Sequence, residues 1–178
     1  MTAIKRGFTL IELLIVIAIL GTLAVVVLLA LNPIQQLARA RDAGRVSAIT
    51  QLGHSLEAYA TSNNGTYVPE SATWITTLVT AGEIQVVPAA ITYSIAGMAA
   101  CSNSFPQNSV CYNATAAAGT APAVVYARLE SQSQNSRCAA ATPAAYAVYS
   151  TADGRGGIVC RAAGAANEPV PGVQVFLP

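Results

Sequence analysis

Charged residues are scarce in this sequence. Asp, Glu, Lys and Arg make up only 10% of its 178 residues, against 53% hydrophobic residues, and the formal net charge is +1. The nine basic residues are scattered, and Asp42 interrupts the densest group, Arg39, Arg41 and Arg45. A nucleic-acid-binding surface needs a concentrated basic patch, so we expect no nucleic-acid partner. The apolar content is also too high for a purely soluble domain.

Residues that commonly perform catalysis are equally few. His54 is the single histidine, and it lies on a predicted helix beside Ser55 and Glu57, where a surface role is the simplest interpretation. None of the four cysteines has the Cys-x-x-Cys spacing of a zinc or redox site. Too few carboxylates surround Asp153 and Gly154 for a calcium loop, so we predict a turn there. We therefore expect no enzyme, no cofactor and no bound metal.

One long apolar run is present near the N-terminus. From Leu13 to Leu31 no residue is charged, and only Gly21 and Thr22 interrupt the aliphatic side chains. A helix of about 20 such residues crosses the hydrocarbon of a bilayer. Lys5 and Arg6 would also suit a cleaved secretory signal, but the apolar part of such a signal is only about 7 to 15 residues long. We therefore predict a membrane-spanning helix.

Glu12 stands at the start of this apolar segment. A carboxylate at the edge of hydrocarbon costs a few kcal/mol unless it reaches water or finds a cation. Snorkelling to the interface is one explanation. Cleavage between Gly7 and Phe8 offers another, because it would create an amino group four residues before Glu12, the spacing of neighbours on a helix. Glu12 would then pair with that amine in its own subunit or in the next one.

The stretch from Lys5 to Ala24, KRGFTLIELLIVIAILGTLA, closely resembles the N-terminal signature of type IV prepilins and of the related pseudopilins of type II secretion. That signature has a short basic leader ending in glycine, then phenylalanine, then a glutamate four residues further on. The resemblance implies that a membrane prepilin peptidase removes the leader, residues 1–7, and methylates the amine of Phe8. It also implies that Glu12 guides assembly by pairing with the Phe8 amine of a neighbouring subunit on an inner-membrane assembly platform.

The predicted membrane and filament-core helix, residues 8–31, is expected to end near Asn32. Proline lacks a backbone donor and disfavours helix in the residue before it, so Pro33 predicts a helix break. Many members of the family carry a helix-weakening proline where this chain has Leu29. Gly21 and Pro33 would bracket a stretch that extends on leaving the bilayer. A plain boundary between two helices is the alternative.

Residues 32–61 have the pattern of an amphipathic helix that continues the first. Its apolar positions recur at spacings of three, four or seven residues, and they are Ile34, Leu37, Val46, Ile49, Leu56 and Tyr59. Its polar positions are Arg39, Asp42, Arg45, Gln51 and Glu57. The run Ser62-Asn63-Asn64-Gly65 predicts its end. The passage SLEAYATSNNGTYVP extends the resemblance to pilins and pseudopilins up to Pro69.

Residues 62–178 are expected to form a globular head. We predict a short helix from Trp74 to Ala81, ending at Gly82, and strands at 91–95, 124–130, 146–150 and 158–161, the last two joined by a turn at Asp153-Gly154. In the second strand Val125, Ala127 and Leu129 are predicted to face the core, and Tyr126, Arg128 and Glu130 to lie on the opposite face. The C-terminal PVPGVQVFLP would add an edge segment. The fold class is thus α+β, a long N-terminal helix packed against a small antiparallel sheet, like the pilin lollipop.

Four cysteines lie in the predicted head: Cys101, Cys111, Cys138 and Cys160. An even number in a domain that projects out of the cytoplasm favours two disulfides, for which three pairings are possible. We favour Cys101 with Cys111, which closes a short loop, and Cys138 with Cys160, which brackets the final hairpin. Free buried thiols are the alternative.

These features indicate a structural subunit. Identical chains that each offer one apolar helix can join head to tail by a contact that does not close, and so grow into a helical homopolymer. By resemblance this is a type IV pilus for adhesion, motility or DNA uptake, built from an inner-membrane, lipid-embedded precursor and displayed at the cell surface. The alternatives are a periplasmic pseudopilin of type II secretion and a monomeric membrane-anchored protein.

Overall fold

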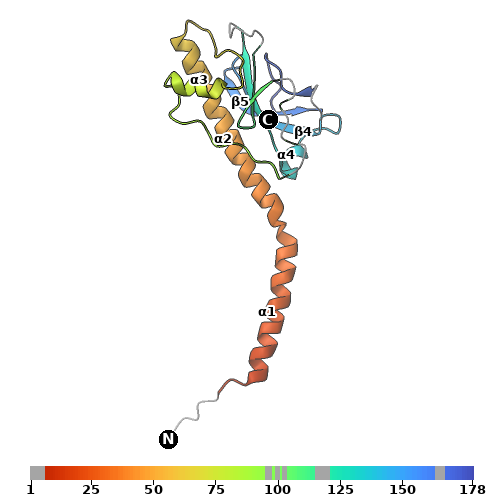
Figure 1. Ribbon diagram of the computed structural model, residues 1–178. Helices are drawn as coiled ribbons and strands as arrows, with labels where there is room; N and C mark the ends of the chain where they lie inside the picture. The colour runs from red at the N-terminus through yellow and green to blue at the C-terminus, as the bar shows by residue number, and fades with distance from the viewer. Residues whose placement is uncertain (1–6, 95–97, 99–100, 102–103, 115–120, 163–166) are drawn as a thin grey trace. The chain divides into compact units, whose positions relative to one another are not determined.

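The computed structural model describes residues 7–94, 98, 101, 104–114, 121–162 and 167–178. The chain divides into two compact units, Met1–Leu37 and Ala38–Pro178. The helices (Figure 1) are α1 (Leu10–Leu31), α2 (Pro33–Ser62), α3 (Trp74–Thr80) and α4 (Gln132–Asn135). The strands are β1 (Phe105–Gln107), β2 (Val110–Ala114), β3 (Ala123–Arg128), β4 (Ala144–Ser150) and β5 (Arg155–Arg161). Apart from Gly7, the predicted leader lies outside the described residues.

In the first unit, α1 is a continuous apolar helix of 22 residues. Among the described residues it is the one helix long and apolar enough to cross a membrane, over Leu10–Leu28 with a mean hydropathy of 2.9. α1 continues through Gly21 in the single chain, and the proposed extension between Gly21 and Pro33 on leaving the bilayer stays a prediction. One glycine costs a helix only about 1 kcal/mol relative to alanine, too little to end a segment of otherwise almost entirely aliphatic residues.

The boundary between α1 and α2 lies at Asn32, where the Asn-Pro pair predicts it. Asn32 has left-handed backbone angles, φ 41° and ψ 71°, which asparagine tolerates better than most residues. Pro33 is the first residue of α2, a position whose N–H would have no helical partner anyway. The Asn32 side-chain oxygen accepts from the Gln35 N–H at 3.4 Å, and the Gln36 side-chain amide donates to the Leu31 carbonyl at 3.0 Å. These bonds satisfy backbone groups that the two helix ends leave free.

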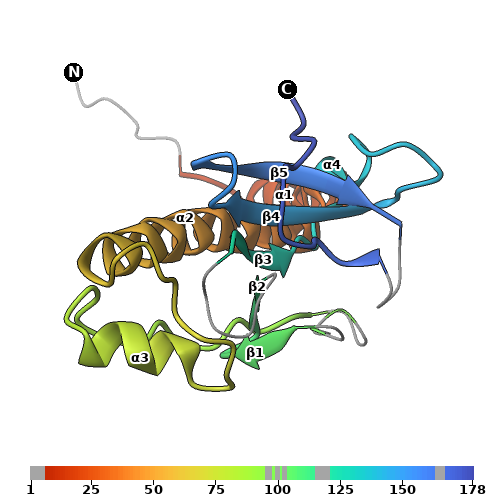
Figure 2. The same ribbon diagram turned by 90° about the horizontal axis from the view of Figure 1, so that it is seen from above.

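The second unit contains a five-stranded antiparallel sheet with the strands in chain order, β1-β2-β3-β4-β5. α2 packs along one face of this sheet, and α3 lies beside β1 (Figure 2). The α+β fold is confirmed, as are the short helix at 74–80 and the strands at 123–128, 144–150 and 155–161. β1 and β2 are additions that the sequence pattern misses.

The predicted strand at 91–95 is wrong over its described residues, 91–94, which form no strand. Their polar backbone groups find separate partners instead of a ladder. The Ile91 N–H donates to the Asn108 carbonyl at 2.9 Å, the Thr92 carbonyl accepts from Arg45, and the Ser94 N–H donates to a carboxylate oxygen of Glu130. Side chains from distant parts of the chain therefore hold this segment.

Both faces of β3 are buried, which corrects the expectation of one polar face. Val125 and Ala127 pack towards α2, in the main core with residues such as Leu52, Leu56 and Trp74. Val124 and Tyr126 belong to a second apolar cluster with Val148 and Val159. Phe176 of the C-terminal tail packs on that cluster and forms an isolated antiparallel β-bridge with Val159 of the edge strand β5. The tail is therefore the edge segment that the sequence predicts.

α2 follows its predicted apolar pattern only in part. Ile49 and Leu56 are buried, but Ile34 and Leu37 are 69% and 61% exposed. Leu52, which the pattern omits, is fully buried. The apolar face that packs on the sheet therefore lies in the later part of α2, and its first turn presents apolar side chains outward.

Asp42 and Arg45 are the clearest departure, since these polar positions are only 2% and 3% exposed. The Arg45 guanidinium donates to Asp42 Oδ1 at 2.7 Å and to Glu130 Oε1 at 2.8 Å, and Arg41 donates to Glu130 Oε2 at 2.8 Å. Asp42 accepts the backbone N–H groups of Glu130 and Ser131. We call the buried residues Asp42, Arg45 and Glu130, together with the half-buried Arg41, the buried ion network. It joins α2 to the chain that follows β3.

Two disulfides close loops in the second unit. Cys101 is bonded to Cys111 and Cys138 to Cys160, at sequence separations of 10 and 22 residues, which is the pairing favoured from the sequence. The first holds the segment before β1 against β2, and the second holds the turn after α4 against β5. By limiting the unfolded chain, each bond typically contributes about 2 to 4 kcal/mol.

Gly53 allows α2 to approach the sheet, because a Cβ at this position would overlap the ring of Tyr149. We expect Gly53→Ala to lower the free energy of unfolding by about 1 to 3 kcal/mol, since the buried ring must move. Gly44→Ala on the same helix is the control, because nothing lies within 4 Å of its added Cβ. That change should be neutral or stabilise by about 0.4 to 1 kcal/mol. Urea unfolding in detergent measures both, and equal stabilities would contradict this packing.

The buried ion network predicts a specific acid sensitivity. Burial alone would raise the pKa of Glu130, but hydrogen bonds from Arg41, Arg45 and the Ser94 N–H lower it below its ordinary value near 4.5. A lowered pKa stabilises the fold above about pH 4.5, and this contribution is lost as the pH falls through the folded-state pKa.

Glu130→Gln should therefore destabilise the protein at pH 7 by about 3 to 5 kcal/mol, because the buried Arg45 loses one of its two carboxylate partners and Arg41 loses its own. The difference from wild type should shrink at acid pH, where Glu130 itself becomes neutral. Urea unfolding at several pH values tests this, with the more exposed Glu83→Gln as control, expected within about 0.5 kcal/mol of wild type. A pH-independent difference would contradict the ionic role.

Candidate functional site

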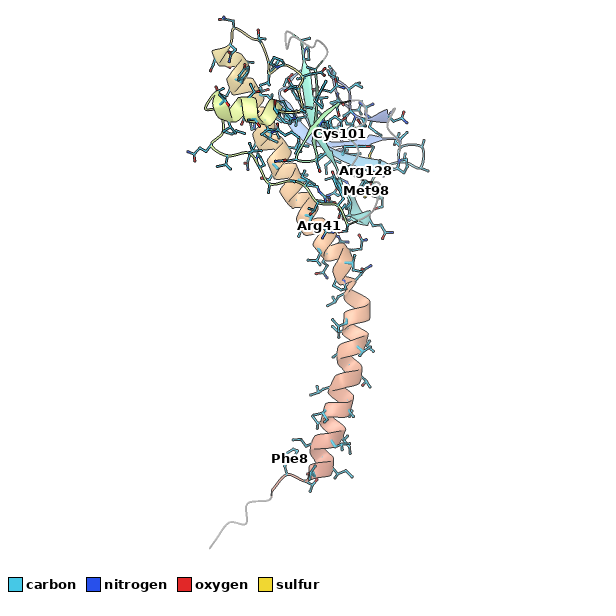
Figure 3. The ribbon with its side chains drawn as sticks, in the orientation of Figure 1. Phe8, Arg41, Met98, Cys101 and Arg128 are labelled. Carbon is cyan, nitrogen blue, oxygen red and sulfur yellow. A yellow bond between two sulfur atoms is a disulfide. The ribbon has the colours of Figure 1, made fainter. Side chains whose placement is uncertain are left out.

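The candidate site begins with the extended residues just before α1. Gly7, Phe8 and Thr9 precede the helix, and Thr9 has the extended angles φ −86° and ψ 150°. Phe8 is 79% exposed and lies at the start of α1 (Figure 3). The Gly7–Phe8 bond is thus outside the helix and uncovered by the described residues of its own unit. A protease could reach this backbone without first unfolding a helical turn.

Thr9 and Glu12 form a capping box at the start of α1. The Thr9 hydroxyl accepts from the Glu12 N–H at 3.3 Å, and Glu12 Oε2 accepts from the Thr9 N–H at 2.8 Å and from its hydroxyl at 2.7 Å. These bonds satisfy donors that a helix start leaves free, and the negative charge lies at the positive end of the helix dipole. In the single chain, Glu12 therefore finds its hydrogen-bond donors locally, in Thr9.

The remainder of the site is the surface of α1 itself. All the large hydrophobic side chains described on this helix are exposed, from Val16 at 47% to Leu10 at 86%. Monomeric soluble proteins rarely expose contiguous apolar areas of more than a few hundred Å². The whole circumference of α1 consequently needs a cover, which lipid chains or other apolar helices can supply.

Other residues singled out in the sequence lie apart from this helix start. His54 is on α2, with its side chain 64% exposed, and its Nδ1 is 3.3 Å from the Tyr149 hydroxyl and 3.9 Å from Glu57 Oε2. Burial, followed by Glu57, raises the pKa of Tyr149. Within the described part of the chain, no group of three or more His, Cys, Asp and Glu residues gathers to hold a metal. The four cysteines belong to the second unit and are all bonded in disulfides.

Sequence reasoning missed Thr9 as a member of the site. The signal is present, because a threonine followed three residues later by glutamate, before an apolar run, is the sequence pattern of a capping box. The sequence pattern predicts surface positions for Asp42 on a helix and for Glu130 on a strand. Their burial depends on a contact between residues 88 positions apart, which local periodicity does not contain.

Comparison with known families identifies the prokaryotic N-terminal methylation motif at residues 3–28. This is the prepilin-type signature, and it covers Gly7, Phe8, Glu12 and most of α1. It implies processing by a prepilin peptidase, and with the apolar helix it fits an inner-membrane precursor. No curated protein and no solved structure matches the chain.

The capping box predicts a measurable effect on the first turn of α1. Thr9→Ala removes the hydroxyl that accepts from the Glu12 N–H, which should destabilise the helix start by about 1 kcal/mol. Amide hydrogen exchange at Glu12 in detergent micelles should then be about fivefold faster. Thr22→Ala is the matched control, because its hydroxyl bonds only the Ile19 carbonyl within the helix. Unchanged exchange in Thr9→Ala would show that the cap contributes nothing.

Proposed function

We propose that this chain is the structural subunit of a type IV pilus-like helical filament. The single observation that supports the proposal is that the methylation motif covers a helix, α1, whose described large apolar side chains are all exposed. A motif on a buried helix would have no surface to assemble with. Here the helix that carries the motif is also the surface that needs partners.

Processing would create a positive charge that can pair with the Glu12 carboxylate inside the membrane. Cleavage after Gly7 removes residues 1–7 and leaves Phe8 with a free α-amino group, which stays largely protonated near neutral pH and after methylation. In a medium of low dielectric constant an amine and a carboxylate attract strongly. Glu12 would exchange part of its bonding to Thr9 for the Phe8 amine of a neighbouring copy, and that pair would fix the neighbour's position.

The other segments would then have distinct positions in the polymer. Residues 8–31 form the apolar core, residues 32–61 continue the helix into the head, and residues 62–178 form the outer surface. Each copy joins the next by a heterologous contact, which does not close and so extends into a helical fibre. The two disulfides suit an outer surface in an oxidising environment.

A pseudopilin of type II secretion carries the same N-terminal motif, and its filament would remain in the periplasm. The two functions differ in where the assembled protein is found. A surface pilus is released when cells are sheared, and it would serve adhesion, motility or DNA uptake. A periplasmic filament stays with the cell envelope, as does a monomeric membrane-anchored protein.

The experiment is to determine the N-terminus and intact mass of the protein in sheared surface material and in membranes. We expect a chain that begins at methylated Phe8 in the sheared fibres. Glu12→Leu should reach the membrane in normal amount and yield no fibres, because the apolar helix is kept and the partner for the amine is lost.

Thr9→Ala separates assembly from capping in this experiment. It weakens the helix start but keeps the Glu12 carboxylate, so it should still give fibres. A chain that retains its leader and is found only in membranes would overturn the proposed function. Normal fibres from Glu12→Leu would overturn the role of Glu12 while leaving a filament subunit. Processed protein confined to the envelope would identify the periplasmic alternative.

A further inference from the structure

The second unit has a basic end, where α2 enters it. Arg41 and Arg45 contact Glu130, which follows β3 by two residues, so they lie beside the Arg128 end of that strand, and Figure 3 shows Arg41 and Arg128 at the same end. Arg161 also belongs here, because it pairs with Ala144 at the start of β4. We call this the basic end. Its described arginines are Arg39, Arg41, Arg45, Arg128, Arg137 and Arg161, and they outnumber the carboxylates Asp42 and Glu130 that bind two of them at the same end.

The opposite end of the same unit, where α2 stops, is acidic. Glu83 accepts from the hydroxyl of Ser62, the last residue of α2, at 3.3 Å. Glu70 accepts from the N–H of Ala114, the strand end furthest from Arg128. Glu57 lies in the last turns of α2, and Asp153 lies in the turn between β4 and β5. We call this group of four acidic residues the acidic end. Arg155 is the arginine described there.

Glu83 lines an open hollow of about 470 Å³ at the acidic end. The other lining residues include Tyr59, Ser62, Asn63, Thr77 and Thr80. The hollow thus offers a carboxylate, an aromatic ring, and hydroxyl and amide oxygens. A guanidinium group uses these partners well, since it pairs with carboxylates through a planar set of donors and stacks on aromatic faces.

Arg39, at the basic end, is a guanidinium available for such a site. Its side chain is exposed, and it makes no hydrogen bond, ion pair or ring contact with the described residues. Arg41 and Arg45 are held by Glu130, and Arg137 and Arg161 donate to Pro178 and Gln174. Arg39 can therefore engage a partner without breaking an existing bond.

The hollow cannot be filled by Arg39 of the same chain. Arg39 and Ser62 lie 23 residues apart on one helix, which at 1.5 Å per residue places them about 35 Å apart. Because the basic and acidic ends face opposite directions along α2, a second copy shifted along that direction brings unlike charges together. Such a contact is heterologous and repeats without closing.

We propose that Arg39 of one copy binds in the hollow beside Glu83 and Tyr59 of a second copy, as a contact between successive heads. The inference rests on the proposed filament function and names a surface that this function requires. Several opposed charges steer the copies into register, and the contact weakens as salt screens them. The N-terminal helix supplies the apolar contact, and the heads supply this polar one.

The test is a charge exchange in the full-length chain, measured as the yield of sheared fibres. Arg39→Glu and Glu83→Arg should each reduce the yield about tenfold, because an exposed attraction becomes a repulsion at every repeat. The double variant should recover most of the yield. Rescue within one chain is excluded by the distance along α2, so recovery identifies a contact between copies. Arg155→Glu is the control of equal charge change: it makes the acidic end more negative but leaves Glu83, the hollow and Arg39 intact, so the fibre yield should not fall, although Arg155 gives up its contact with the Phe176 ring.

The outcomes separate this contact from the filament function itself. If wild type gives fibres that begin at Phe8 and both single variants assemble equally well, the Arg39–Glu83 contact is wrong and the filament function stands. If Arg39→Glu reduces assembly and Glu83→Arg does not restore it, Arg39 meets another partner, such as lipid headgroups, and the inference is overturned. If wild type gives no fibres, the proposed function fails first, and this contact fails with it.

Discussion

The constraint on which everything else depends is the uncovered surface of α1. Helix formation satisfies its backbone internally, which is required in lipid, but leaves a full circumference of aliphatic side chains outside. No described side chain of its own unit packs around it. A bilayer or a bundle of identical helices can cover it, and these two environments are chemically alike. The chain can therefore exchange one for the other, which is what a filament drawn from a membrane requires.

In the second unit, both apolar and ionic contacts hold α2 against the five-stranded sheet. Leu52 and Leu56 of α2 supply the apolar contact, and Gly53 permits close approach to Tyr149. At the end of β3 the contact is ionic. Replacing a buried ion network by apolar residues is often neutral or stabilising, so its advantage over packing is geometric. Asp42 binds two consecutive backbone N–H groups, which fixes the register between α2 and the chain after β3.

Features that depend on local composition can be predicted from the sequence. Features that depend on contacts between distant residues cannot. The apolar run, the Asn32 boundary and the last hairpin are local, and all are found. β1 and β2 were not predicted because they are short and β1 contains Pro106. Their turn also lacks the usual glycine, since Asn108 and Ser109 take the positive φ angles. The burial of the Asp42 and Glu130 side chains depends on Arg45, which donates to both, and Glu130 lies 85 residues further along the chain, a separation that no periodicity records.

The chemical likeness of lipid and helix core has a further consequence. Because lipid chains are as apolar as leucine, the hydrophobic effect gives α1 little preference for another helix over the membrane. Packing and polar contacts must then decide whether copies associate, and in which register. Glu12 is the acidic residue within the described membrane segment, and in the single chain Thr9 is its hydrogen-bond partner. A subunit that brings a cation to this carboxylate would gain a specific interaction that lipid cannot match, so one residue in an apolar helix can set the direction of assembly.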